Sequence, residues 1–264
     1  MARTRAGRSW GPGVLGVLGI LGFLLTWELL PLTGIVNPRY LPPASEVLLE
    51  LGEQLGSAGF WLAVWQTVRA WFLGLLIAAV AAIVLGLVIG SSAFLRRATH
   101  STIEFLRPIP SVALIPLAVL LFGVQLESTL LLVVYASFWQ ILIQVLYGVG
   151  DVDTVAQDTA KSYGLGPVAR VRYVTWPTSL PYVITGLRLG AAVALILAVT
   201  AQLVIGTPGL GREISLAQSG GAVTAMYAFI VTAGLLGVLI NLGMRALERR
   251  ALSWHSSVRG EVAV

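Results

Sequence analysis

The chain of 264 residues contains no cysteine and only one lysine, Lys161. Without cysteine, the protein can form neither a disulfide bond nor a thiolate nucleophile or metal ligand. Only 11% of the residues are charged, against roughly a quarter in a typical soluble domain. With 57% hydrophobic residues, a soluble domain of this size could not bury its apolar surface. The composition therefore predicts an all-α, polytopic membrane protein.

Histidine is also scarce, and the charge balance is basic. The two imidazoles, His100 and His255, show no spacing that suggests a metal site, so we expect no metal. A pI near 10.0 is compatible with a nucleic-acid partner. The arginines, however, flank apolar runs, as the positive-inside rule describes. We therefore expect a membrane rather than nucleic acid as the partner, and a place in the bacterial plasma (inner) membrane.

Apolar runs of span length divide the chain into about six transmembrane helices. The first run, Gly13 to Leu30, is longer than the roughly 7–15 apolar residues of a signal peptide, and no A-x-A site follows it. The arginine-rich flanks predict that both termini are cytoplasmic. No second domain or repeat is visible, so residues 1–264 form a single transmembrane domain. The later spans are predicted at 60–90, 102–124, 128–149, 182–205 and 222–247.

Several segments carry more specific expectations. Residues 44–55 have one apolar and one acidic face, which is typical of a short surface helix, with Ser45 as a candidate N-cap. Gly86 and Gly90 form a small-xxx-small pair for close helix packing. Three prolines should distort the third span, and residues 206–213 (GTPGLGRE) are predicted to form an outer loop.

The most polar segment, residues 151–181, separates the fourth and fifth spans. Asp153 can cap a helix that contains no glycine or proline from residue 154 to 163. The sequence Gly164-Leu165-Gly166-Pro167 then ends one helix and begins another, because glycine suits the C′ position and proline suits N1. This pattern predicts two helices and a tight turn on the cytoplasmic side. The alternative is an ordinary solvated loop.

The segment resembles the cytoplasmic "EAA" loop of binding-protein-dependent ABC importer permeases. The similarity lies in Asp158-Thr159-Ala160, in a glycine six residues after Asp158, and in two later prolines. Asp158 and Thr159 depart from the Glu-Ala of the family pattern. The resemblance implies that residues 151–178 form a coupling loop that contacts an ATPase. Its matching positions are Asp158, Thr159, Ala160, Lys161, Gly164, Gly166, Arg170 and Pro177.

Other segments resemble the nitrate, sulfonate and taurine branch of that family. They are LRPIP at 106–110, YVITGLR at 182–188 and GTPGLG at 206–211. Gln202 departs from the branch, since many relatives carry glutamate there. The resemblance implies the type I importer permease fold. It also implies cytoplasmic ATPase subunits, a soluble or lipid-anchored substrate-binding protein and a second permease copy, most simply a homodimer.

The chain has no nucleotide site of its own. The P-loop pattern G-x-x-x-x-G-K-[ST] needs a lysine after a glycine-rich loop, whereas Lys161 lies within a predicted helix. We therefore expect no enzymatic activity and no cofactor in this chain, with ATP and Mg²⁺ bound by a partner ATPase.

Seven polar residues in or beside the predicted spans are candidates for the translocation pathway. They have two possible uses, because polar side chains within a span either line a path for a polar solute or form hydrogen bonds between helices. They are Ser111, Tyr135, Ser137, Gln140, Gln144, Thr200 and Gln202.

Two classes of transporter are compatible with these features. The favoured one is the permease subunit of an ATP-driven importer for a small, anionic solute delivered by a binding protein. The alternative is a secondary transporter driven by an ion gradient, which usually carries acidic residues within spans and inverted repeats. The sequence shows neither an acid at a span centre nor a repeat.

Overall fold

The structure, a computed structural model, describes residues 12–252, and all regular secondary structure in that range is helical. Arg3, Arg5, Arg8, His255 and Arg259 lie outside the described residues. The elements are α1 (Pro12–Leu32), α2 (Ala44–Gln54), α3 (Ala58–Ser91), α4 (Ala93–Leu106), η1 (Ser111–Leu114), α5 (Ile115–Phe122), α6 (Leu126–Gly150), α7 (Thr154–Ser162), α8 (Pro167–Arg170), η2 (Val171–Thr175), α9 (Trp176–Ile205), α10 (Leu210–Ser219) and α11 (Val223–Ala251).

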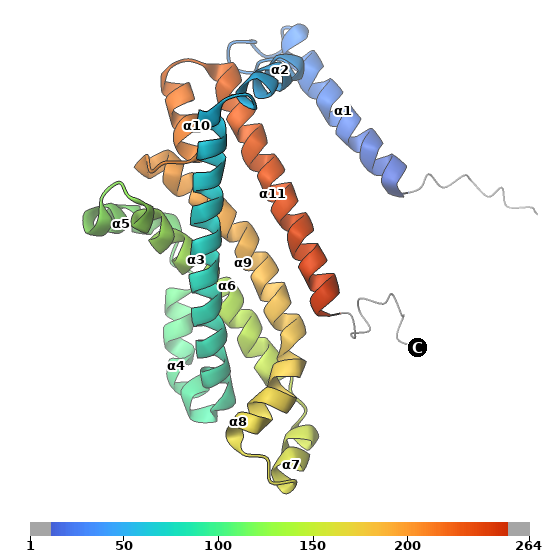
Figure 1. The fold of residues 1–264 in the computed structure, drawn as a ribbon, viewed down its shortest axis with the longest axis vertical. Coiled ribbons are helices and arrows are strands. Elements are labelled where there is room, and N and C mark those ends of the chain that lie inside the picture. Colours follow the sequence, from blue (N-terminus) through green and yellow to red (C-terminus); the bar gives the residue numbers. More distant parts are fainter. Residues whose placement is uncertain (1–11, 253–264) are drawn as a thin grey trace, which may run out of the picture.

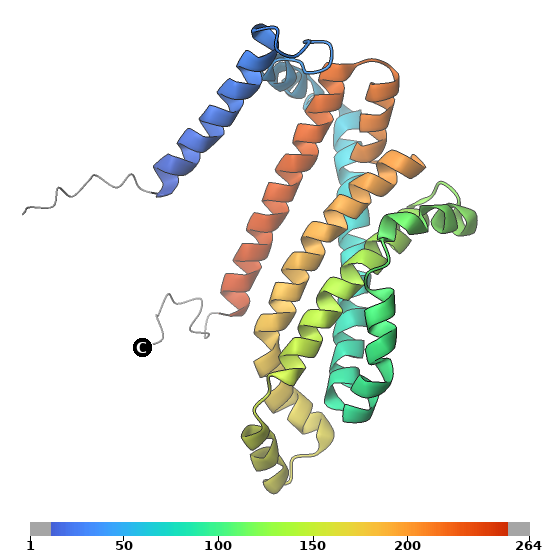
Figure 2. The same cartoon turned by 180° about the vertical axis from the view of Figure 1, so that it is seen from behind.

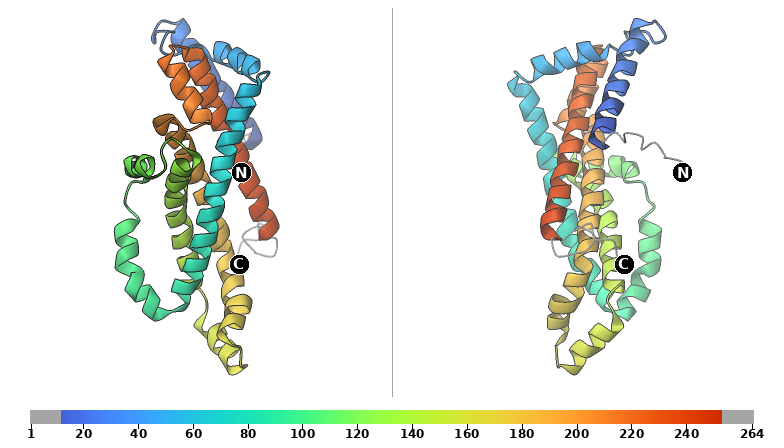
Figure 3. Two further views of the ribbon diagram at one scale, coloured as in Figure 1. Left: turned by 60° about the vertical axis from the view of Figure 1, so that its left-hand side comes forward. Right: turned by 90° about the vertical axis from the view of Figure 1, so that its right-hand side faces the viewer.

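Three long helices, α3, α6 and α9, form the centre of the bundle (Figure 1). Helix α11 lies along α9, and α1 diverges from the bundle, joined to it at the end that carries α2 (Figures 1 and 2). Helices α2 and α10 lie at one end of the molecule, whereas α7 and α8 project from the other (Figure 3).

Within residues 12–252, five helices are long and apolar enough to cross a membrane, and a sixth span results if α4 and the η1–α5 segment count as one bent span. This agrees with the predicted all-α architecture of about six spans. The third span does not run continuously over 102–124 as expected. Helix α4 begins at Ala93 and ends at Leu106, and the following helical segment is turned by 81°. Pro108 and Pro110 explain the break, because proline lacks an amide donor and disfavours helix at the preceding residue.

The helix that contains the fifth span begins before the predicted span. Helix α8 continues through the π-helical turn η2 into α9, so that one continuous rod extends from residue 167 to 205. Pro177 is the second residue of α9, just after the π-helical turn, and Pro181 lies inside α9. The span predicted at 182–205 is the C-terminal part of this rod.

Two local expectations are also corrected. Only residues 206–209 of the predicted outer loop are non-helical, because α10 begins at Leu210 and buries Leu210 and Ile214. Ser45 is not an N-cap but the second residue of α2. Its backbone N–H and its hydroxyl both donate to the Glu28 carboxylate of α1, at 2.9 and 2.8 Å.

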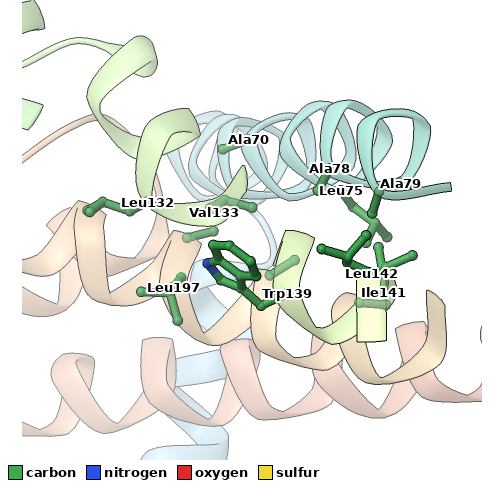
Figure 4. Close-up of a cluster of buried hydrophobic side chains, with 14 of the residues drawn as sticks. Ala70, Leu75, Ala78, Ala79, Leu132, Val133, Trp139, Ile141, Leu142 and Leu197 are labelled. Atoms are coloured by element: carbon green, nitrogen blue, oxygen red, sulfur yellow. The ribbon is translucent and has the colours of Figure 1, made fainter. Parts of the chain in front are cut away.

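Glycines on α3 allow the close approach of α6. A Cβ on Gly86 would lie 2.6 Å from Val145 Cγ1, and one on Gly90 would lie 2.8 Å from the Val149 Cβ. The predicted packing role of this glycine pair is confirmed. The core beside it is formed by alanines of α3 with leucine, isoleucine and tryptophan side chains of α6 (Figure 4).

Helix α9 approaches α6 in the same way from the other side. A Cβ on Gly186 would lie 3.2 Å from the Ile141 Cα, and one on Gly190 would lie 3.0 Å from Ile141 Cγ1. The indole N–H of Trp71 on α3 donates to the Ala191 carbonyl of α9 at 2.9 Å. The three helices therefore form one tightly packed unit.

Replacing Gly86 with leucine should destabilise the bundle, because the side chain has no room against Val145. Overpacking of this kind typically costs about 1–3 kcal/mol. The thermal midpoint of the purified protein in detergent measures the effect. Gly243→Leu is the matched control, since a Cβ on Gly243 in α11 would meet no atom within 4 Å. Equal midpoints for the two variants would contradict the packing account.

Candidate coupling and translocation sites

The α7–α8 segment is built as a helix, a tight turn and a second helix. The Asp153 carboxylate accepts from the Val155 N–H at 2.9 Å and caps α7. At the other end, the Gly164 N–H donates to the Lys161 carbonyl and the Leu165 N–H to the Ala160 carbonyl. This is a Schellman cap, which requires the positive φ of 77° that Gly164 adopts. Gly166 then precedes Pro167, the first residue of α8.

The segment is anchored to the bundle at its base. Val152 and Ala160 are buried. The hydroxyl of Tyr182 on α9 donates to the Asp151 carboxylate at 2.9 Å. The base of the segment is therefore attached both to α6, which ends at Gly150, and to α9.

The remainder of the segment is exposed and mixes charged with apolar side chains. Lys161 donates to Asp158 at 2.7 Å across one turn of α7. Tyr163 and Val168 are 81% and 80% exposed, and Val155 and Tyr173 also face outward. Large apolar side chains exposed at a projecting tip, next to charged ones, are typical of a protein-binding surface.

The predicted coupling residues do not all lie together. Asp158, Thr159 and Lys161 are exposed on α7, whereas Ala160 is turned inward. Arg170 ends α8 and is half-buried. It borders a cavity of about 300 Å³ together with Arg96 of α4 and residues of α7. Pro177 is exposed in the first turn of α9.

The predicted pathway residues divide into two groups. Two are fully buried in hydrogen bonds between segments: the Ser137 hydroxyl donates to the Gly190 carbonyl at 3.2 Å, and Gln202 binds Thr67. The others are half-buried. Tyr135 donates to the Leu106 carbonyl at 2.7 Å, where the third span breaks. Ser111 lies in η1, Gln140 and Gln144 on α6, and Thr200 on α9.

Gln202 and Thr67 hold the 206–209 loop and α10 against the bundle. The Thr67 hydroxyl lies 2.9 Å from Gln202 Oε1 and accepts from the Leu210 N–H at 2.9 Å. Gln202 Oε1 also accepts from the Gly211 N–H at 3.3 Å. Any side chain at Gly211 would collide with the backbone of α9. We call this arrangement of Thr67, Gln202, Leu210 and Gly211 the polar clamp.

A hollow of about 680 Å³ lies between α4 and α6. Gln140 is the one predicted pathway residue among the groups that border it. Arg96 and Arg107 also line it, together with His100 and Glu104, which are 3.4 Å apart. Arg96, His100, Glu104 and Arg107 follow the three- and four-residue spacing of one helical face on α4, whereas the approach of Gln140 on α6 depends on the tertiary fold.

The roles of Thr67 and Gly211 were missed in the sequence. Thr67 is separated from Gln202 by 135 residues, and no local pattern predicts such a contact. The GTPGLG motif was the available signal for Gly211. Among residues 12–252, no group of three or more His, Asp or Glu side chains could hold a metal ion.

The fold defines a polytopic membrane subunit with a short helix that projects from one end (Figure 3). Residues 74–253 match the family described as "Binding-protein-dependent transport system inner membrane component". The chain therefore belongs to this family of ABC importer permeases, which are multi-pass inner-membrane proteins without catalytic activity or cofactors. ATP hydrolysis in these systems takes place on a separate subunit.

Individual relatives place the chain in the taurine, sulfonate and nitrate branch. It is 34% identical to the taurine transport system permease protein TauC of Escherichia coli (strain K12), covering 89% of this chain and 88% of that one. It is 25% identical to the putative aliphatic sulfonates transport permease protein SsuC of Bacillus subtilis (strain 168), covering 98% and 94%. The predicted family is thus confirmed, and an ion-gradient-driven transporter is not supported.

A solved structure shows the same fold. A chain of the inward-facing MetNI methionine ABC transporter matches with a TM-score of 0.63, covering 72% of this chain and 96% of that chain. The sequences are 20% identical. The likeness establishes the importer permease fold.

Replacing Thr67 with valine should destabilise the polar clamp, because the Leu210 N–H loses its acceptor in a buried site. Leaving such a donor unpaired costs about 1–3 kcal/mol. Thr232→Val is the matched control, since the buried Thr232 hydroxyl bonds only the Ala228 carbonyl of its own helix. Thermal unfolding in detergent compares the two, and a larger loss in the control would refute the clamp.

Proposed function

We propose that this chain forms the translocation pathway of an importer for a small organic sulfonate, with taurine as the first candidate. The single observation that carries the importer mechanism is the exposed α7–α8 tip, firmly anchored to α6 and α9. The substrate class follows from the relatives named above, which include a taurine and an aliphatic sulfonate permease.

The charge distribution supports an orientation with the α7 end in the cytoplasm. Basic residues concentrate toward that end of the bundle: Arg96, Arg97, Lys161, Arg170, Arg172, Arg245, Arg249 and Arg250. At the α2 end, the basic side chains of the described residues are Arg39 and Arg212. By the positive-inside rule, this bias supports an orientation in which the start of α1 and the end of α11 face the cytoplasm.

The α7 helix would dock on a cytoplasmic ATPase, and residues 151–178 form its coupling loop within a single transmembrane domain. Tyr163 and Val168 supply apolar contacts, while Asp158 and Lys161 supply charged ones at the rim. When the ATPase subunits close on ATP, the displacement of α7 would reach α6 and α9 through the hydrogen bond between Asp151 and Tyr182. The rigid packing of these helices converts it into tilting of the spans.

Two copies of the chain would form the pathway, and a binding protein would deliver the solute to the α2 end. The hollow beside Gln140 supports an anionic solute, because two arginines and one glutamate line it. Tyr135, Gln140, Gln144, Ser111 and Thr200 remain candidates for contact with the solute. Ser137 and Gln202 are held in interhelical hydrogen bonds in this conformation.

Asp158→Arg should uncouple ATP hydrolysis from uptake, because it replaces an exposed acid on the docking face with a positive charge. In proteoliposomes with the partner ATPase and binding protein, we expect ATP-dependent taurine uptake to fall by roughly tenfold or more, equivalent to about 1.4 kcal/mol of lost coupling. Membrane insertion should be normal. Arg249→Glu reverses an exposed charge on α11, at the same end of the bundle as α7, and should have no such effect.

Gly164→Pro tests the same element through its backbone. Proline cannot adopt the φ of 77° and has no N–H to donate to the Lys161 carbonyl. Uptake that stays at the wild-type level in both Asp158→Arg and Gly164→Pro would rule out a coupling role for α7.

A further inference from the structure

A second, smaller hollow of about 290 Å³ lies where α3, the start of α6 and the end of α9 meet. The groups on its wall that matter here are polar or basic: Gln66, Arg69, Gln125, Thr129, Gln202 and Thr207. None of the residues bordering it is acidic. Glu127, the nearest acid in sequence, borders a separate apolar hollow.

Gln202 is 1% exposed, and only the oxygen of its side-chain amide forms hydrogen bonds. Its Oε1 atom accepts from the Thr67 hydroxyl and from the Gly211 N–H. The Gly211 contact fixes the orientation of the amide, because a backbone N–H needs an oxygen opposite it. The Nε2 group is then left buried without any partner in the described structure. An unpaired buried donor of this kind is costly unless a ligand or water accepts from it.

Arg69 of α3 brings a positive charge to the same hollow, and its side chain is exposed. Within residues 12–252, Arg69 takes part in no salt bridge. Gln66 lies three residues earlier, on the same face of α3. An exposed arginine without an acidic partner is available to an anionic ligand, with which it forms charge-assisted hydrogen bonds.

The start of α6 adds a further positive contribution. This helix has 25 residues, and Gln125 at its N-cap makes no side-chain capping bond. Gln125 and Leu126 both border the hollow. Its first N–H groups and the positive end of the helix dipole therefore lie beside Arg69 and Gln202.

We propose that this hollow is a subsite for the anionic group of the transported solute, a sulfonate or a comparable oxyanion. Arg69 supplies the charge, and the Gln202 Nε2 group, Gln66 and the α6 amides supply donors. Because Gln202 also belongs to the polar clamp, a solute bound in the subsite would contact a residue that holds the 206–209 loop against the bundle. The inference rests on the proposed function, since it assigns a site to the same solute.

The test is equilibrium binding of radiolabelled taurine and of radiolabelled sulfate to the purified permease–ATPase complex in nanodiscs, without binding protein. We expect saturable binding that Arg69→Gln weakens by roughly tenfold to a hundredfold, the range for one charged hydrogen-bonding partner. Arg69→Lys should restore part of the affinity. Arg212→Gln is the matched control, because Arg212 is exposed on α10 and does not border the hollow.

Gln202→Glu provides a second variant that keeps an oxygen for Thr67 and Gly211. It removes the Nε2 donor and adds a negative charge at a buried position, so it should weaken binding of both anions. Chloride at the same concentration should not compete, which separates an oxyanion subsite from a general attraction of anions.

Two failures are distinguishable. If wild type imports taurine with ATP but binds neither probe, or if Arg69→Gln binds both as wild type does, the subsite is refuted and the proposed function stands. If wild type performs no ATP-driven taurine uptake, the proposed substrate is wrong. Sulfate binding by wild type and Arg69→Gln then still decides whether the hollow is an anion site.

Discussion

The close approach of α3 and α9 to α6 is the constraint on which the rest of this structure depends. Glycines on α3 and α9 let the helix backbones approach until valine and isoleucine side chains of α6 fill the interface. In a bilayer, where lipid is as apolar as the side chains, such packing is a main source of helix association. Because the three helices are closely packed against one another, we expect them to move as one rigid unit rather than as independent spans.

That rigidity links the two ends of the molecule. At one end, Asp151 and Tyr182 tie the α7–α8 tip to α6 and α9. Toward the other end, Thr67 and Gln202 fasten the 206–209 loop and α10 to α3 and α9. In the proposed mechanism, a displacement of the tip would reach the region of the polar clamp through this packed core. This connection between the two ends is the physical basis for the proposal that ATP hydrolysis on a partner subunit drives transport through this chain.

Much of the fold is visible in the sequence because it depends on local signals. Apolar runs of span length, the Gly86–Gly90 pair and the stop-and-restart signal at Gly164–Pro167 each predict what the structure contains. The predicted start of the fifth span at residue 182 lies inside a longer helix. In the structure, the π-helical turn η2 ends just before Trp176 and Pro177, and Pro181 lies inside α9.

The sites were less predictable, because they depend on contacts between distant residues. Gln202 lies within a predicted span, but its partner Thr67 is 135 residues away in the sequence. Arg96 and Arg107 share one face of α4, and only the tertiary fold brings Gln140 of α6 to the same hollow. Helix α10 was taken for a loop because its glycine-rich start dominated the pattern, although Leu210 and Ile214 give it a buried face.

The central claim is that α7 moves with a partner ATPase and carries the bundle with it. The absence of cysteine makes a direct measurement possible. Spin labels on Thr159→Cys, an exposed α7 position, in both permease copies of the assembled complex report the distance between the two tips. The account predicts a clear change in this distance between the nucleotide-free complex and one trapped with ATP by a hydrolysis-deficient ATPase. An identical distance distribution in the two states would contradict it.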